Sequence, residues 1–443
     1  MVLRTRLGAA LARARETRAA LVGTRVLGSV PELLRTEFPG ARAIVVADPR
    51  TWRAAGTTVR EALVAAGLEG EPPVLLEAYP LHATSRGVEQ VTAALASNTC
   101  TPVAVGSGTI NDLVKLAAGR LGRPYLVVGT AASMDGYAAF GASITHEGLK
   151  QTFACPAPRV IVADLDVMRR APPELVAAGY GDLLAKVVCG ADWLLADATG
   201  IEPVDATAWS LVQEGLPEAI GDPAALARGE PAVWSAFVEG LLLGGLAMQW
   251  TRTSRPASGA EHQFSHLWDM QHAQTGAATT AHGFQVGVAS RFVAALYEEM
   301  LAVPFEALDV AVACAGWPDW PACEAETRAR FGGDGALAGL AVRETRAKHV
   351  TREALAAELG RLRLAWPALR PRLQRQLLSS AEMGRRLRVI GAPDTPETIG
   401  HSRGDLVDSV LLAQRIRRRY TVLDACLRVG CLERLAERAC GRL

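Results

Sequence analysis

The sequence lacks the features of a nucleic-acid-binding or membrane-spanning protein. Its 47 lysines and arginines almost balance its 46 aspartates and glutamates, and no basic stripe is interleaved with aromatic residues. A nucleic-acid groove therefore has little support. The longest uncharged apolar run in the middle of the chain, 240–250, is shorter than the roughly 20 residues of a bilayer span. We expect this run to lie in a buried helix, and we expect no membrane span.

Disulfide and zinc-ribbon patterns are missing as well. The eight cysteines include no C-x-x-C pair, so we expect reduced, mostly buried thiols in a cytoplasmic enzyme. The first 27 residues are rich in arginine and alanine, with Glu16 as their single acid. This composition faintly resembles a transit peptide, but the spacing of the arginines favours an amphipathic N-terminal helix.

At 443 residues the chain exceeds what one hydrophobic core usually serves, which predicts two domains. Short β-rich runs alternate with helical patterns up to residue 168, whereas helical patterns alone follow Pro172. We therefore predict an α/β Rossmann-like dinucleotide-binding domain with a mostly parallel sheet over 1–168, and an all-α metal- and substrate-binding domain over 169–443. The predicted strands are 43–46, 74–76, 103–105, 125–128 and 160–162.

A glycine turn follows the predicted strand 103–105. The segment GSGTIND begins at Gly106 and leads into a helical pattern, and a strand, a glycine turn and a helix N-terminus together form an anion site. Asn111 stands where the usual dinucleotide fingerprint has its third glycine, so an ordinary turn remains an alternative. Asp48 ends an earlier strand, where a carboxylate either binds an adenosine ribose or serves as a turn residue before Pro49.

Three potential metal ligands lie in separate segments: Asp182, His262 and His282. One carboxylate and two imidazoles suit catalytic zinc, and they suit nickel or iron nearly as well. On a helix, His262 and His266 project from one face because they are four residues apart. Each residue is also compatible with a structural role, and Asp182 with Lys186 fits an ordinary ion pair on a helix surface.

Taken in order, the segments GSGTIND, TAASMDG, AGYGDLLAK, SRPASGAEHQFSH and AHGFQVG closely resemble the glycerol-1-phosphate dehydrogenase family. This family includes archaeal lipid enzymes and a bacterial arabinose-operon type, within the iron-containing alcohol dehydrogenase and dehydroquinate synthase superfamily. The resemblance extends to the C-terminal segments IGAPDTPETIG and RRRYTVLD. It implies reversible reduction of dihydroxyacetone phosphate to sn-glycerol 1-phosphate, with NAD(H) or NADP(H) as the cofactor. It also implies one divalent metal per subunit, for which we expect zinc, with nickel and iron as alternatives.

The resemblance also implies roles for individual residues. It assigns metal binding to Asp182, His262 and His282, and it places Asp135 at the substrate. The implied cofactor residues are Gly106, Ser107, Gly108, Asp112, Thr130 and Ser133, to which the sequence adds Asp48.

Chemical reasoning extends this hypothesis to the proton and the phosphate. A metal in the triad would polarise the substrate carbonyl, and His266 would relay the proton while Asp135 helps to hold the hydroxyls. A phosphate dianion needs cations, which points to Lys150, Lys186 and Arg255 at the mouth of a cleft. The alternatives are a glycerol dehydrogenase-like enzyme, a cyclising synthase and a non-catalytic nucleotide- or metal-binding protein. We expect a homo-oligomer without a nucleic-acid partner.

Overall fold

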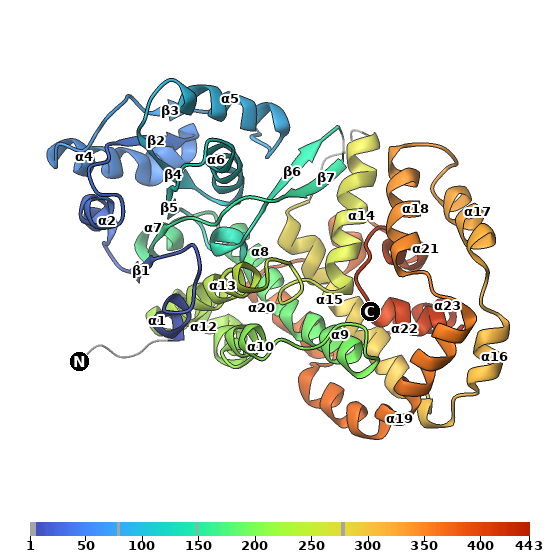
Figure 1. Cartoon of the computed structure of the whole chain (residues 1–443). Coiled ribbons are helices and arrows are strands. Elements are labelled where there is room, and N and C mark those ends of the chain that lie inside the picture. Colours follow the sequence, from blue (N-terminus) through green and yellow to red (C-terminus); the bar gives the residue numbers. More distant parts are fainter. Residues whose placement is uncertain (1–5, 78–79, 148, 276–279) are drawn as a thin grey trace. The chain divides into compact units, whose positions relative to one another are not determined.

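The computed structural model describes residues 6–77, 80–147, 149–275 and 280–443. The chain forms two compact units (Figure 1): residues 1–183 with 207–254, and residues 184–206 with 255–443. This division differs from the predicted boundary after residue 168. The segment 207–254 belongs with the α/β unit, because α13 (Pro231–Thr251) packs against α1 (Arg6–Leu11) and β1 (Ala19–Gly23) of that unit.

Unit 1 contains a six-stranded, fully parallel sheet of order β1-β8-β5-β4-β2-β3. β3 and β4 lie on opposite sides of β2, so the direction in which successive strands are added to the sheet reverses at this point. In an open parallel sheet, nucleotides usually bind at the carboxyl ends of the strands beside such a switch point. The remaining two strands, β6 and β7, form an antiparallel hairpin. The strands are β1 (Ala19–Gly23), β2 (Ala43–Ala47), β3 (Val74–Leu75), β4 (Thr101–Gly106), β5 (Leu126–Gly129), β6 (Ala142–His146), β7 (Leu149–Phe153) and β8 (Val160–Asp164).

Helices cover both faces of the sheet, and β2, β4, β5 and β8 are buried along their whole length. Val45, Val103 and Val128 pack with α2 and α4 in one apolar core, while the alternate residues of these strands are buried on the opposite face. The helices of unit 1 are α1 (Arg6–Leu11), α2 (Val30–Glu37), α3 (Pro49–Thr51), α4 (Thr57–Ala65), α5 (Ser85–Ala96), α6 (Gly108–Arg120), α7 (Leu165–Arg169), α8 (Pro173–Leu184), α10 (Ala206–Gln213), α11 (Leu216–Ile220), α12 (Pro223–Ala227) and α13 (Pro231–Thr251), with short turns at Leu27–Ser29, Trp52–Gly56 and Gly136–Ala138.

Two expectations for the N-terminal half need correction. In the described residues the expected amphipathic N-terminal helix is α1, whereas residues 19–23 form β1, which pairs with β8 at the sheet edge. The other is the hairpin of β6 and β7, whose strands were not predicted. All five predicted strands are present, with ends shifted by at most two residues.

The apolar run 240–250 lies within α13, as expected. In the described part of the chain α13 alone is long and apolar enough to cross a membrane, and 61% of its most apolar window is buried inside the structure. Gly244 and Gly245 of this helix lie against Asp135, and an added Cβ at Gly245 would come within 2.7 Å of the Asp135 carbonyl oxygen. The helix therefore serves the core of unit 1 and supports the loop that carries Asp135.

The regular elements of unit 2 are all helices in its described residues, and none of these residues forms a strand, which confirms the fold class of the C-terminal half. Its longest helix, α19, contains Pro367 and Pro371. The helices are α9 (Lys186–Ala198), α14 (Ala260–Thr275), α15 (His282–Leu301), α16 (Val310–Ala315), α17 (Trp320–Arg330), α18 (Ala336–Lys348), α19 (Arg352–Gln376), α20 (Ser380–Ile390), α21 (Arg403–Arg415), α22 (Val422–Arg428) and α23 (Leu432–Cys440), with short turns at Phe305–Ala307 and Pro396–Ile399.

Candidate active site

The predicted glycine turn lies at the carboxyl edge of the sheet. β4 ends at Gly106, Ser107 is the N-cap, and α6 begins at Gly108. Gly106 pairs with Gly129 of β5, and the N–H of Thr130 donates to the carbonyl of Gly106 at 3.1 Å. The side chain of the N-cap residue Ser107 makes no capping hydrogen bond, so the first N–H groups of α6 keep their preference for an anion.

Asp48 lies at the end of β2, next to β4 at the same edge. Its Oδ1 accepts hydrogen bonds from the N–H groups of Arg50 and Thr51, at 2.7 and 3.1 Å, and so caps α3. The turn role is therefore present in the structure. A ribose contact stays a prediction, for which the second carboxylate oxygen would be needed.

Two residues of the GSGTIND segment support the loop around them. Asn111 is fully buried, and its amide contacts the carbonyl of Gly136 at 3.4 Å and the hydroxyl of Tyr125 at 2.9 Å. Asp112 accepts a hydrogen bond from the N–H of Ser143 at 3.0 Å and lies 3.5 Å from Lys115 Nζ. Asn111 thus replaces a glycine because it ties α6 to the loop after β5, and Asp112 ties α6 to β6.

The loop after β5 carries the half-buried Ser133 and the buried Asp135. The N–H of Asp135 donates to Asp182 Oδ2 at 3.0 Å, which couples this loop to α8. Gly179 of α8 makes that approach possible, because an added Cβ there would lie 2.0 Å from the carbonyl oxygen of Ala132. The loop and the carboxylate of Asp182 are therefore held in one arrangement.

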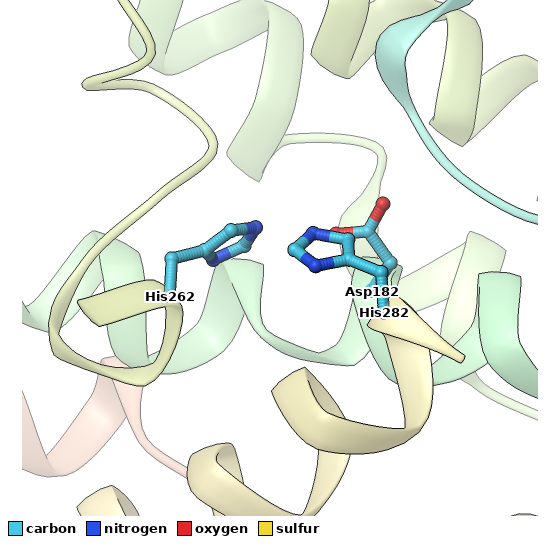
Figure 2. A group of neighbouring side chains, drawn as sticks. All are labelled: Asp182, His262 and His282. Carbon is cyan, nitrogen blue, oxygen red and sulfur yellow. The ribbon is translucent and has the colours of Figure 1, made fainter. Parts of the chain in front are cut away.

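The structure brings the three predicted ligands together. One ligand atom each from Asp182, His262 and His282 lies within 4.8 Å of the others, and the three side chains converge (Figure 2). Asp182 comes from α8, His262 from the first turn of α14, and His282 is the first residue of α15. A carboxylate and two imidazoles at this spacing fit a divalent metal such as zinc, nickel or iron.

Neighbouring side chains orient both imidazoles. His262 Nδ1 lies 2.7 Å from Glu261 Oε1, and His282 Nδ1 lies 2.9 Å from Ser265 Oγ. Ser265 Oγ donates to Gln285 Oε1 at 2.7 Å, so it accepts the proton of His282 Nδ1. Both rings then carry their proton on Nδ1, which leaves each Nε2 lone pair for a ligand.

Glu261 belongs to a second buried carboxylate group. Its Oε1 also accepts from the N–H of Gly259 at 2.7 Å, while Asp192 accepts from Tyr297 Oη, the N–H of Val422 and the N–H of Ala260. Burial and the charge of Glu261 raise the pKa of Asp192 to about 7. An added Cβ at Gly259 would lie 2.5 Å from Asp192 Oδ2 and 2.8 Å from Glu261 Oε2, so glycine is required between the two carboxylates.

His266, the predicted proton relay, lies one turn beyond His262 on α14 and is half-buried. Its ring centroid is 6.3 Å from that of His262 and 6.0 Å from that of His282. His266 is thus a neighbour of the cluster but not one of its three members.

Comparison with known proteins shows the family to which the chain belongs. The family model described as iron-containing alcohol dehydrogenase matches residues 21–172. A glycerol-1-phosphate dehydrogenase [NAD(P)+] of Halalkalibacterium halodurans is 34% identical over 279 residues, which are 62% of this chain and 70% of the relative. The relative of the same name from Pyrococcus horikoshii is 31% identical over 281 residues, 63% of this chain and 78% of its own. The chain belongs to the glycerol-1-phosphate dehydrogenase family.

Membership of the glycerol-1-phosphate dehydrogenase family makes this protein an oxidoreductase. The fold is similar to that of a glycerol dehydrogenase from Schizosaccharomyces pombe, with a TM-score of 0.59 at 14% identity over 96% of this chain and 91% of the other. At that identity the likeness concerns the fold alone.

The predicted phosphate anchors of this family member have unexpected surroundings. Arg255 is 1% exposed, and it donates to the carbonyls of Tyr420 and Asp192 at 2.9 and 2.8 Å and pairs with Glu202 at 3.3 Å. Lys186 is fully buried at the start of α9, and only Lys150 on β7 is half-buried. Arg255 and Lys186 are both buried in the packing of unit 2, so a contact of either residue with a substrate phosphate stays a prediction.

The residues that hold the proposed ligands in place were not predicted. In the sequence these residues stand out only by their distance from the two histidines. Glu261 directly precedes His262, Ser265 follows His262 by three residues, and Gln285 follows His282 by three residues. Asp192 carries no local signal, because its partners lie up to 230 residues away. An ordinary helix pattern surrounds it.

Proposed function

We propose that this protein catalyses the reversible, NAD(P)H-dependent reduction of dihydroxyacetone phosphate to sn-glycerol 1-phosphate. The observation that carries the proposal is the convergence of Asp182, His262 and His282 with both imidazoles oriented through Nδ1. The relatives are named glycerol-1-phosphate dehydrogenase [NAD(P)+], which supports the substrate and the cofactor of this proposal. A divalent metal held by these donors would supply a Lewis acid for the carbonyl oxygen, and the nicotinamide would supply the hydride.

Residues of the chain position the reactants and move the proton. We propose that His266 delivers the proton that the reduced oxygen requires, since it lies beside the ligand histidines and is partly exposed. Asp135, whose backbone is fixed to Asp182, is proposed to hold a substrate hydroxyl. The carboxyl edge formed by β2, β4 and β5 is proposed to bind the cofactor, with Asp48 at the ribose and the first turn of α6 at the pyrophosphate.

The decisive experiment is cofactor oxidation by metal-loaded protein with dihydroxyacetone phosphate, compared with dihydroxyacetone, for NADH and NADPH in parallel. We expect turnover of the phosphorylated substrate and its loss after treatment with a chelator. A preference for dihydroxyacetone or glycerol would replace the proposal with a glycerol dehydrogenase activity. Absence of turnover with any of these substrates in metal-loaded protein would favour a binding protein.

A further inference from the structure

Three consecutive arginines connect α21 and α22, and they have different surroundings. Arg418 is exposed, and its guanidinium pairs with both carboxylate oxygens of Glu344 at 2.9 and 3.1 Å. Arg417 and Arg419 are half-buried and turn instead towards one residue, Ser258. Arg417 Nη1 lies 3.4 Å from Ser258 Oγ, and Arg419 Nη1 donates to the Ser258 carbonyl at 2.6 Å.

Positive charge is concentrated at this point. In the residues that the structure describes, no carboxylate lies within 4.0 Å of the Arg417 guanidinium. Burial lowers the pKa of Arg417 despite the charges of Glu344 and Glu261, and burial with the charges of Arg417 and Arg255 lowers the pKa of Arg419 to about 9. Because a guanidinium stays protonated at neutral pH, these shifts record desolvation and like-charge repulsion that a bound anion would relieve.

The arginine segment is fixed to the helix that carries a proposed metal ligand. Ser258 precedes His262 by four residues, and Gln263, next to His262, donates to the carbonyl of Arg419 at 3.4 Å. Thr421 continues the link, because its hydroxyl lies 3.5 Å from Gln263 Oε1. The two guanidinium groups therefore contact Ser258, which lies two residues before α14 begins and four before His262.

We propose that Arg417 and Arg419, together with Ser258 Oγ, form the subsite that binds the phosphate of a short phosphomonoester substrate. The proposal rests on the proposed function, and it assigns the phosphate to residues other than Arg255 and Lys186. A phosphate dianion accepts paired N–H bonds from guanidinium groups, and a hydroxyl provides a further donor. Burying such a dianion without these partners would be strongly unfavourable.

The test compares Arg417→Gln with Arg418→Gln, a neighbouring arginine whose charge is already paired with Glu344. We expect Arg417→Gln to lower kcat/KM for dihydroxyacetone phosphate by roughly 10- to 150-fold, the range for one charge-assisted hydrogen bond, and to leave kcat/KM for dihydroxyacetone nearly unchanged. Arg418→Gln should change neither. Arg417→Lys keeps the charge but loses the paired geometry, so we expect a smaller loss; it also serves as the test variant if Arg417→Gln does not fold.

Calorimetry with inorganic phosphate on the metal-loaded protein separates the subsite from the catalytic proposal. Weaker phosphate binding in Arg417→Gln than in Arg418→Gln supports the subsite, even if the wild type does not reduce dihydroxyacetone phosphate and the proposed function fails. The subsite is overturned if the wild type reduces dihydroxyacetone phosphate and Arg417→Gln behaves like Arg418→Gln. Equal losses on the phosphorylated and unphosphorylated substrates also overturn it, because Arg417 would then support α14 and not the phosphate.

Discussion

Two regions differ in the groups that we propose to bind ligands. They are the carboxyl edge of the sheet in unit 1, which offers mainly backbone groups, and helices α14 and α15 in unit 2, which offer side chains. At the sheet edge the proposed cofactor groups are mostly backbone, presented where β4 ends and α6 begins. On α14 and α15 the proposed ligand atoms belong to side chains that buried polar neighbours hold in place, among them Glu261, Ser265 and Gln285. A site made of backbone tolerates side-chain changes, whereas a site made of buried polar side chains is sensitive to each of them.

The largest effect is expected from substitution of a proposed metal ligand on α14. We predict that His262→Ala reduces the bound metal well below one equivalent and turnover to background, because one of three converging donors is lost. His272→Ala is the matched control on the same helix, since its ring stacks on His401 and not on the ligand cluster. Metal analysis and steady-state kinetics check both variants. Full metal occupancy in His262→Ala would remove this residue from the ligand set.

A smaller effect is expected one turn along α14. His266→Ala should keep its metal but slow the chemical step by roughly 10²-fold or more, the magnitude of lost acid–base help. Single-turnover kinetics with NADH and its deuterated form would show whether hydride transfer or the proton limits the rate. Loss of metal together with activity would make His266 a structural support of the cluster.

The residue that orients His262 should affect metal binding by less than a ligand does. We predict that Glu261→Gln lowers metal affinity by about 10-fold and Glu261→Ala by up to about 100-fold, because an orienting partner of a ligand has effects of this size. Competition with a chelator of known affinity measures both. Unchanged affinity in Glu261→Ala would mean that the contact between Glu261 and His262 does not prepare the imidazole.

The buried carboxylates should also make stability depend on pH. The pKa of Asp192 is about 7 in the folded protein and 3.8 for an unperturbed aspartate, so its ionisation is less favourable in the fold. The metal-free protein should therefore lose stability as the pH rises from about 4 to about 7, by up to about 1.4 kcal/mol per pH unit. Glu261→Gln removes one of the causes and should flatten this slope. Chemical denaturation across the pH range tests it, and an unchanged slope in Glu261→Gln would contradict the coupling.

The smallest effect belongs to the sheet edge, where Asp48 has two candidate roles. Asp48→Asn keeps a good N-cap but removes the charge, so we expect little loss of stability and a shift in preference from NADH towards NADPH. Asp48→Ala also loses the cap and should cost about 0.5–2 kcal/mol of stability. Thermal unfolding and the kcat/KM ratio of the two cofactors separate the roles. If neither variant alters that ratio, Asp48 acts only as the cap of α3.

Local patterns predicted the inner strands well because those strands are apolar, buried on both faces and bounded by glycine or aspartate. They failed for β1, a half-buried edge strand whose sequence AALVG reads as readily as a helix. The predicted boundary after residue 168 differs from the division of the structure, in which α13 joins unit 1. This helix is apolar on all sides, so no local pattern indicates which unit it joins.

By itself the sequence determined the alternation of strands and helices, the glycine turn after β4 and the identity of the three proposed ligands. Only the tertiary structure decided which charged residues are buried and which partners they have. The sequence does not distinguish the environments of Arg255 and Arg417. In the structure, Arg255 donates hydrogen bonds to the carbonyls of Asp192 and Tyr420, whereas Arg417 contacts Ser258. The reason is that the energy of a buried charge depends on groups brought together across more than 100 residues, and no local pattern records them.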